Sequence, residues 1–199
     1  MKIGLLREGK NDERPIKKLL EKIATGVISF NCIPGDGQII TKIPSSLEIF
    51  FGNAAEKADI AVLISDLDRY PNREKEVREI LSKNKYFLQG EKIISGFPNP
   101  NFEQWIISEE DAIKTLFKLE GSQQLPHNDI KNPKDRLQKL IDESEFADDF
   151  TITNEEIYTK IVDKINLKTL AQRDTSFQKF LTEAEKVLKS KPSLFPELI

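Results

Sequence analysis

The sequence predicts an α/β protein built on a mostly parallel sheet, and three observations support this fold class. Short apolar segments alternate with amphipathic segments through the first half of the chain, in the order β-α-β-α-β-α-β. Parallel strands need a long connection between them, which a helix usually supplies. The second half of the chain holds only helical patterns. We therefore expect a four-stranded sheet flanked by helices, with a helical C-terminal half.

Four apolar segments are the predicted strands, and three helices connect them. The strands are expected at 2–6, 27–33, 59–65 and 91–96, and the helices at 10–24, about 45–57 and about 71–84. Pro15 is tolerated only in the first turn of a helix, which favours Asp12 as the N-cap of the first helix. Pro34-Gly35-Asp36-Gly37 has the composition of a turn, so Asp36 is expected to be a turn residue.

The second half is expected to pack on the sheet as part of the same globule. Apolar residues between 102 and 117 share one helical face, which places Trp105 in the core. Further helices are expected at about 133–143, 154–165 and 174–189, with a loop over about 119–132. We divide the chain into an α/β core over 1–98 and a helical extension over 99–199.

Composition narrows the function classes without selecting one. The 199 residues carry a net charge of −3, which argues against a passive nucleic-acid coat but allows an enzyme that meets nucleic acid through a metal ion. Cys32 and His127 are single, which excludes an internal disulfide and histidine-rich metal sites. There is no apolar run long enough to span a bilayer, and the N-terminus does not read as a signal peptide. We expect a cytoplasmic protein with no membrane partner.

Two carboxylates follow the most apolar strand. Asp66-Leu67-Asp68 follows Ile60–Ile64 after a single residue, Ser65. Residues two apart on a strand point to the same side, roughly 6.5–7 Å apart along the chain. Such a pair repels itself when it is partly desolvated, and a divalent cation removes that cost. Mg²⁺ prefers one or two carboxylates together with water and phosphate oxygens.

The first strand offers a matching acid. Glu8 lies just past its end, and if strands one and three are neighbours it faces Asp66 and Asp68 at the carboxyl edge of the sheet, where ligands of such folds bind. Three acids from two strand ends can hold one or two metal ions that act on a phosphodiester. Two roles are possible for Asp12, the N-cap of the first helix and a metal ligand.

At these residues the sequence resembles the Toprim domain of topoisomerases, bacterial primases, recombination-repair proteins and overcoming-lysogenization-defect nucleases. In that family the first strand ends in a glutamate, often within EGxxD, and the third ends in DxD. Here these are Glu8-Gly9-Lys10-Asn11-Asp12 and Asp66-Leu67-Asp68. The resemblance covers roughly residues 1–98. It implies that Glu8 is a general acid/base or a metal ligand, and that Asp66 and Asp68 hold Mg²⁺, with Mn²⁺ as the alternative ion.

The rest of the chain resembles small stand-alone Toprim-like proteins of unassigned function. The shared segments are PNPNFEQWIISEEDAIKTLF, NPKDRLQKLI and INLKTLAQRDTSFQKFL. The resemblance implies a partner ATPase of the ABC or structural-maintenance type and a role in antiviral defence. Glu103 matches the acid of an E-x-W element, and its two readings are a further metal ligand and an acid that favours the helix dipole. Lys10, Arg69 and Arg73 are candidate phosphate contacts, and the alternative for each is an ordinary surface charge.

The leading functional hypothesis is a Mg²⁺-dependent nuclease that cleaves nucleic-acid phosphodiester bonds, with DNA favoured over RNA. The alternative is a non-catalytic or partner-gated module that docks an ATPase. A topoisomerase would need a tyrosine on a separate strand-passage module, and Tyr70, Tyr86 and Tyr158 come with no room for one. A primase is compatible with the chemistry, although the usual zinc-binding and helicase-binding parts are absent. A receiver domain, which accepts a phosphoryl group on an acid, is a poor match, because it expects an acidic pair after the first strand and a lysine after a fifth strand.

Overall fold

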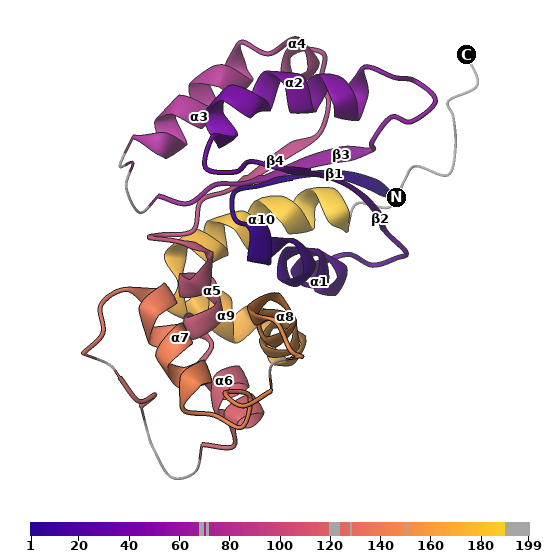
Figure 1. Cartoon of the computed structure of the whole chain (residues 1–199). Helices are drawn as coiled ribbons and strands as arrows, with labels where there is room; N and C mark the ends of the chain where they lie inside the picture. The colour runs from indigo at the N-terminus through magenta and orange to yellow at the C-terminus, as the bar shows by residue number, and fades with distance from the viewer. Residues whose placement is uncertain (68–69, 71, 120–123, 128, 150, 190–199) are drawn as a thin grey trace.

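The computed structural model has a four-stranded, all-parallel sheet flanked by helices (Figure 1). It describes residues 1–67, 70, 72–119, 124–127, 129–149 and 151–189. The strands are β1 (Lys2–Arg7), β2 (Ser29–Pro34), β3 (Ile60–Ile64) and β4 (Ile93–Gly96). Their order across the sheet is β2-β1-β3-β4, with every neighbouring pair parallel. The predicted fold class is confirmed, and all four strands lie where the apolar segments predicted them.

Helices cover both faces of this sheet. A 3-10 turn, η1 (Lys10–Asp12), leads into α1 (Glu13–Ile23), which shares one face with the late helix α10 (Thr175–Leu188). The other face carries α2 (Ile39–Phe51), α3 (Arg73–Ser82) and α4 (Lys85–Leu88). Figure 1 shows these two layers above and below the strands.

Alternating side chains of β3 pack into two separate hydrophobic cores, one on each face of the sheet. Ile60, Val62 and Ile64 belong to the larger core under α1 and α10. Ala61 and Leu63 belong to the smaller core under α2 and α3. Successive strand residues point to opposite faces, so a strand covered on both sides must be apolar throughout. This is why the strand before the Asp66 motif is an unbroken apolar run.

The second helix lies earlier in the chain than predicted. The expectation of about 45–57 is wrong, since α2 spans Ile39–Phe51 and ends before Gly52. It follows directly on the turn that contains Asp36 and Gly37, both of which have positive φ. Its buried residues Ile39, Ile43, Leu47 and Phe50 recur at helical spacing, so the core determines where it begins. Pro44 lies inside this helix.

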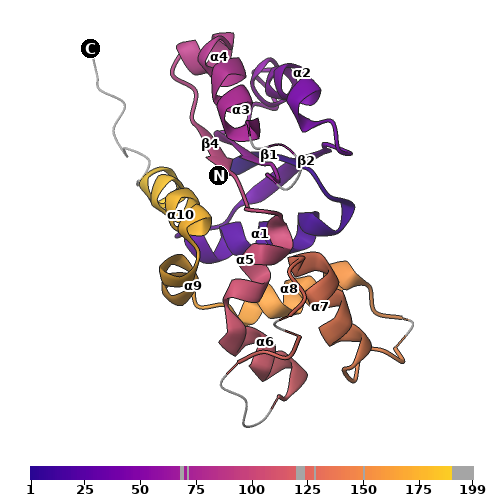
Figure 2. The same ribbon diagram turned by 90° about the vertical axis from the view of Figure 1, so that its left-hand side faces the viewer.

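Besides α10, the described part of the C-terminal half forms five helices below the sheet, which we call the helical lobe (Figure 2). They are α5 (Phe102–Ser108), α6 (Glu110–Phe117), α7 (Pro133–Asp142), α8 (Asn154–Lys164) and α9 (Leu167–Arg173). The single helical face predicted over 102–117 is divided at Glu109, whose side chain accepts a hydrogen bond from the Ala112 N–H at 2.8 Å. Asn166 caps α9 in the same manner, and that helix was not predicted.

Trp105 links the lobe to the sheet. Its ring stacks on Phe180 of α10 at 5.2 Å and meets Phe177 edge-on at 5.3 Å. Its indole N–H donates to the Ser176 hydroxyl at 2.7 Å, so the one polar atom of the ring is satisfied. Trp105 is 1% exposed, and the larger core runs through it from the strands into the lobe. No helix in the described part of the chain is long and apolar enough to cross a membrane.

Candidate functional site

The two central strands end side by side where the chain changes direction across the sheet. From β1 the chain moves outward to β2, and from β3 it moves outward to β4 on the other side. Open α/β sheets bind ligands at such a switch point, outside the carboxyl ends of the strands. Arg7 pairs with Ile64 in the last register position of the two strands. Glu8 and Ser65 therefore begin the rim of the sheet next to each other.

Glu8 bridges the two strand ends through its carboxylate. One oxygen, Oε2, accepts the Asp66 backbone N–H at 3.1 Å and the Ser65 hydroxyl at 3.2 Å. The side chain is 16% exposed, which leaves part of it open to solvent. Strands one and three are neighbours, which was the condition for Glu8 to face this segment, and Glu8 lies beside the Asp66 backbone.

Arg73 faces the other oxygen of Glu8 from the start of α3. Its Nη2 lies 3.7 Å from Glu8 Oε1, and its side chain is 4% exposed. The guanidinium lies over the Tyr70 ring, 4.1 Å from its centroid. Within the described residues its Nε has no hydrogen-bond partner. A buried donor without a partner typically costs about 1–3 kcal/mol, so Arg73 is held here by charge and by stacking on Tyr70.

The segment after β3 is anchored to the start of the lobe. Asp66 Oδ1 accepts the Phe102 N–H at 3.1 Å. The Leu67 N–H donates to the carbonyls of Pro98 at 3.1 Å and Pro100 at 2.9 Å. The first acid of the DxD motif thus has a fixed position at the junction of β3, β4 and α5.

Three of the predicted site residues lie wholly or partly outside the described part of the structure. Asp68 and Arg69 fall outside the described residues, and so does the side chain of Lys10, whose backbone belongs to η1. Their roles as metal ligand and phosphate contacts stay predictions.

Asp12 and Glu103 form a second acidic pair, which is buried at the junction between η1 and α5. They are 6% and 7% exposed. Burial and, to a lesser extent, the nearby charge of Glu103 raise the pKa of Asp12 from 3.8 to about 6, against the opposing effect of its hydrogen bond from Gly9. Burial also raises the pKa of Tyr158 on α8, with Glu103 and Asp12 adding to the effect. The three groups therefore share one poorly solvated space.

Asp12 occupies the N-cap position of α1 without capping it through its side chain. Its Oδ2 accepts the Gly9 N–H at 2.9 Å, and no side-chain bond to the first turn of α1 forms. A Cβ atom at Gly9 would clash with this carboxylate, which is why glycine stands there. Asp12 therefore closes the turn after β1. It stands at the N-cap position of α1, but the side-chain hydrogen bond expected of an N-cap is absent, and its role as a metal ligand stays a prediction.

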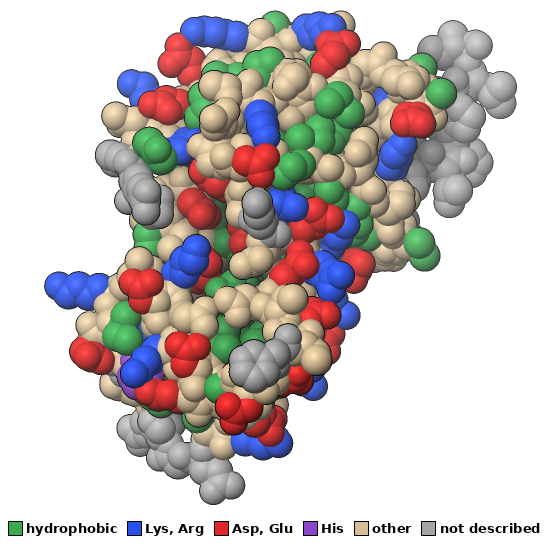
Figure 3. All heavy atoms as spheres, in the orientation of Figure 1, with side chains coloured by type: hydrophobic (Ala, Val, Ile, Leu, Met, Phe, Trp, Pro, Cys, Tyr) green, Lys and Arg blue, Asp and Glu red, His purple; other side chains and the backbone are tan. Residues whose placement is uncertain are grey.

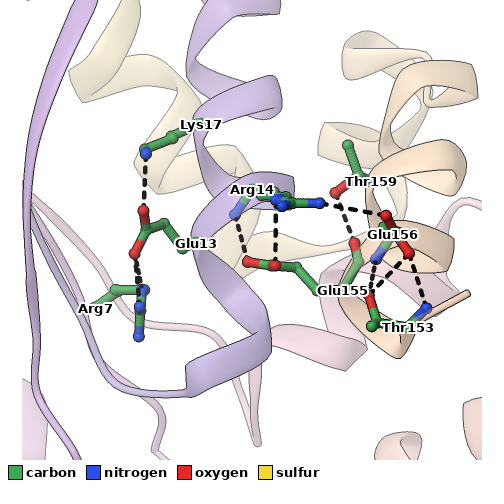
Figure 4. A network of polar contacts seen from close by, with 8 residues as sticks. All are labelled: Arg7, Glu13, Arg14, Lys17, Thr153, Glu155, Glu156 and Thr159. Atoms are coloured by element: carbon green, nitrogen blue, oxygen red, sulfur yellow. Dashed lines mark hydrogen bonds and ion pairs between the residues drawn. The ribbon is translucent and has the colours of Figure 1, made fainter.

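Charged pairs surround the turn that carries Asp12 (Figure 4). Arg7 donates to Glu13 at 2.6 Å and to the Gly9 carbonyl at 2.5 Å, and Lys17 donates to the other oxygen of Glu13 at 2.8 Å. Arg14 reaches from α1 to Glu155 and Glu156 at the start of α8, with both ion pairs at 3.4 Å. Figure 3 shows acidic and basic side chains mixed along this junction between sheet and lobe.

The described residues supply two acidic pairs, and no group of three or more described His, Cys, Asp or Glu residues is arranged to hold a metal ion. The third ligand expected at the strand ends is Asp68, which lies outside the described residues. The donors that are present are carboxylate oxygens, which is the chemistry that Mg²⁺ prefers. The set therefore fits Mg²⁺ in kind, and Asp68 is needed to complete it.

Sequence reasoning missed three residues of this region. Ser65 donates its hydroxyl to Glu8, Arg7 holds Glu13 beside the Asp12 turn, and Tyr158 lies beside Asp12 and Glu103. A small polar residue that directly follows an apolar strand, and an arginine within an otherwise apolar one, were the available signals for Ser65 and Arg7. Nothing in the local pattern marks Tyr158.

No protein-family model, no curated protein and no solved structure matches this chain.

Proposed function

We propose that this protein is a metal-dependent phosphodiesterase of the Toprim type that cleaves nucleic acid. The observation that carries the proposal is the position of Glu8, which is hydrogen-bonded to the first two residues after β3, Ser65 and Asp66, at the switch point of the sheet. An acid contributed by one central strand and a D-x-D motif contributed by its neighbour are what the Toprim resemblance requires. DNA is the expected substrate, and Mg²⁺ or Mn²⁺ the expected ion.

Glu8, Asp66 and Asp68 are the residues proposed to hold the ion. When bound, Mg²⁺ would neutralise charge on the phosphodiester and activate the attacking water. The chain contributes the placement of these carboxylates. Ser65 and the Asp66 N–H fix one oxygen of Glu8, and the Phe102 N–H fixes one oxygen of Asp66. Fixed donors of this kind hold reacting groups within the narrow tolerances that catalysis needs.

Arg73 provides a positive charge beside these acids. It approaches Glu8 from the opposite side to Ser65 and is kept in place by Tyr70. It limits the repulsion among the carboxylates before an ion binds. Asp12 and Glu103 remain proposed as additional ligands, since two buried acids in one space are stabilised by a cation.

The test is cleavage of supercoiled plasmid and of labelled oligonucleotides in Mg²⁺ and in Mn²⁺. Glu8→Gln and Asp66→Asn should each reduce the rate by about 100-fold or more, because loss of even an outer-shell partner commonly costs 10–100-fold. Mn²⁺ binding followed by electron paramagnetic resonance should weaken in the same variants. This second measurement reports on the site without turnover.

Glu79→Gln is the matched control for these variants. Glu79 is an exposed acid on α3 that pairs with Lys83, away from the strand ends. It should leave both cleavage and Mn²⁺ binding within about twofold of wild type. Equal cleavage by wild type, Glu8→Gln and Asp66→Asn would refute the assignment of the site.

A second candidate is a partner-gated module with no activity of its own. The observation that favours it is the engagement of both Glu8 oxygens, one with Ser65 and the Asp66 N–H and the other with Arg73. Such a site would need an ATPase partner to release Glu8 before it could act. Cleavage by the isolated chain would refute this candidate, whereas cleavage that begins only when the partner is added would support it.

A further inference from the structure

A pocket of about 230 Å³ lies beside the proposed site, between α3 and α10 at the carboxyl end of β4. Leu67 forms part of its wall and directly follows Asp66. Asn99 lines it as well, between the two prolines whose carbonyls accept the Leu67 N–H. A ligand in this pocket would therefore lie next to whatever the strand-end acids hold.

The pocket offers polar side chains that have no hydrogen-bond partner among the described residues. Ser95, Asn99, Thr175 and Lys179 line it, and none of their side chains is hydrogen-bonded to another of the residues that the structure describes. Hydroxyl and amide groups both donate and accept, so they suit a ligand whose edge carries both kinds of group.

The charges around the pocket cancel. Arg78 and Lys179 are opposed by Glu74 and Glu183, and Arg78 is already paired with Glu74 at 2.9 Å. A phosphate would meet two carboxylates here, which disfavours a strongly anionic ligand. Phe97 and Phe180 also line the pocket, and such apolar lining favours an uncharged ligand.

From the pocket's size, neutrality and position, we propose that it binds one unpaired nucleobase next to the phosphodiester at the strand ends. The inference rests on the proposed function and names its substrate class: single-stranded or locally unpaired nucleic acid. A volume of about 230 Å³ is below the usual range for drug-sized ligands, about 300–1,000 Å³. It has room for a single heterocycle, and a base pair would not enter.

Trp105 provides a native reporter for this pocket. It is the single tryptophan of the chain, it stacks on Phe180, and its N–H donates to Ser176. Phe180 and Ser176 both line the pocket, so a base that enters should change the emission of Trp105. The experiment titrates the full chain with a 12-nucleotide oligothymidylate and with a 12-base-pair duplex in EDTA, and follows Trp105 emission and the anisotropy of a label on the nucleic acid.

Thr175→Phe is the variant that fills the pocket. Thr175 is an exposed residue at the start of α10, so the added ring should occupy the pocket mouth without entering the core. Gln178→Phe is the matched control, since Gln178 is exposed on the same helix and does not line the pocket. Both variants should unfold at the same denaturant concentration as wild type.

Wild type should bind the single strand about tenfold more tightly than the duplex, with a change in Trp105 emission. Thr175→Phe should weaken single-strand binding about tenfold, whereas Gln178→Phe should bind as wild type does. Equal binding by wild type and Thr175→Phe would overturn the inference, and so would equal affinity for strand and duplex or no binding of either. The proposed function is read separately, from cleavage in Mg²⁺ by wild type and Asp66→Asn, so the two can fail independently.

Discussion

Two pairs of acids lie near the carboxyl ends of the central strands, and the two pairs differ in burial and in their neighbours. Glu8 and Asp66, the edge pair, are at the rim of the sheet, where each accepts a hydrogen bond from a backbone N–H. Asp12 and Glu103, the junction pair, are buried between η1 and α5, where burial raises the pKa of Asp12 to about 6. Glu8 and Asp12 are four residues apart in the same EGxxD motif, and the motif alone does not distinguish their surroundings. The structure places Glu8 among donors at the partly open rim, whereas Asp12, which also accepts the Gly9 N–H, is buried beside a second acid.

The difference shows what each pair can do before any ion binds. The edge pair is held by donors that favour carboxylates, so it forms a fixed arrangement of acceptors. The junction pair carries an electrostatic penalty that a proton or a cation would relieve. The following predictions test this contrast, beginning with the largest expected effect.

Arg73→Met should destabilise the protein by about 3 kcal/mol, because Glu8 then keeps its charge without the buried cation beside it. Urea unfolding followed by circular dichroism would measure the loss. The double variant Arg73→Met with Glu8→Gln should recover more than half of it, since neither charge then remains. Strict additivity of the two single changes would show that the ion pair does not hold the edge pair in place.

Asp12→Asn should stabilise the protein at pH 7. The folded-state pKa of about 6 lies above the ordinary 3.8, so the folded state binds the proton more tightly than the unfolded state. This group therefore lowers stability as pH rises from about 4 to about 6, and its contribution stays constant above that. At about 1.4 kcal/mol per pH unit, the gain from Asp12→Asn at pH 7 is at most about 3 kcal/mol, and it should vanish below pH 4.

Unfolding measured from pH 4 to pH 8 checks this gain, with Asp142→Asn as the control. Asp142 is exposed at the end of α7, so its variant should stay within about 0.5 kcal/mol of wild type. Parallel pH curves for wild type and Asp12→Asn would contradict the buried-acid account. If the junction pair also binds metal, Mg²⁺ at pH 8 should raise the melting temperature of wild type more than that of Asp12→Asn.

Ser65→Ala should cost about 1 kcal/mol, the usual value of one hydrogen bond, because Glu8 keeps its bond from the Asp66 N–H. Thermal unfolding would measure it. Ser65→Thr should retain most of the stability, since it keeps the hydroxyl. A loss of several kcal/mol in Ser65→Ala would mean that the edge pair depends on this one donor rather than on the strand ends.

Arg14→Ala should have the smallest effect, below about 1 kcal/mol. Arg14 links α1 to Glu155 and Glu156, but its side chain is 58% exposed and water competes for these ion pairs. The difference from wild type should shrink further in 1 M NaCl. A loss above 2 kcal/mol that falls steeply in 1 M NaCl would show that the charged contacts in Figure 4, rather than burial, hold α8 and Tyr158 against the junction pair.

The sheet could be predicted from the sequence because its strands are buried on both faces. Ile60–Ile64 has no alternative to being an internal strand, and the adjacency of β1 and β3 then brings Glu8 next to Asp66. The bounds of α2 could not be predicted, because Pro44 is locally a helix-start signal and only contacts such as Phe50 on Gly4 fix where the helix lies. The junction pair was equally out of reach, since its burial arises from α5 and α8, which are distant in the chain.

The position of α10 has a consequence for how this chain is synthesised. Phe177, Phe180 and Ala184 complete the larger core against a sheet whose last strand ends at Gly96. About 80 residues separate Gly96 from α10, and a ribosome adds roughly 5–20 residues per second. The four strands therefore leave the ribosome several seconds before α10, which shares with α1 the covering of one face of the sheet. That interval is when the nascent chain most needs protection from aggregation.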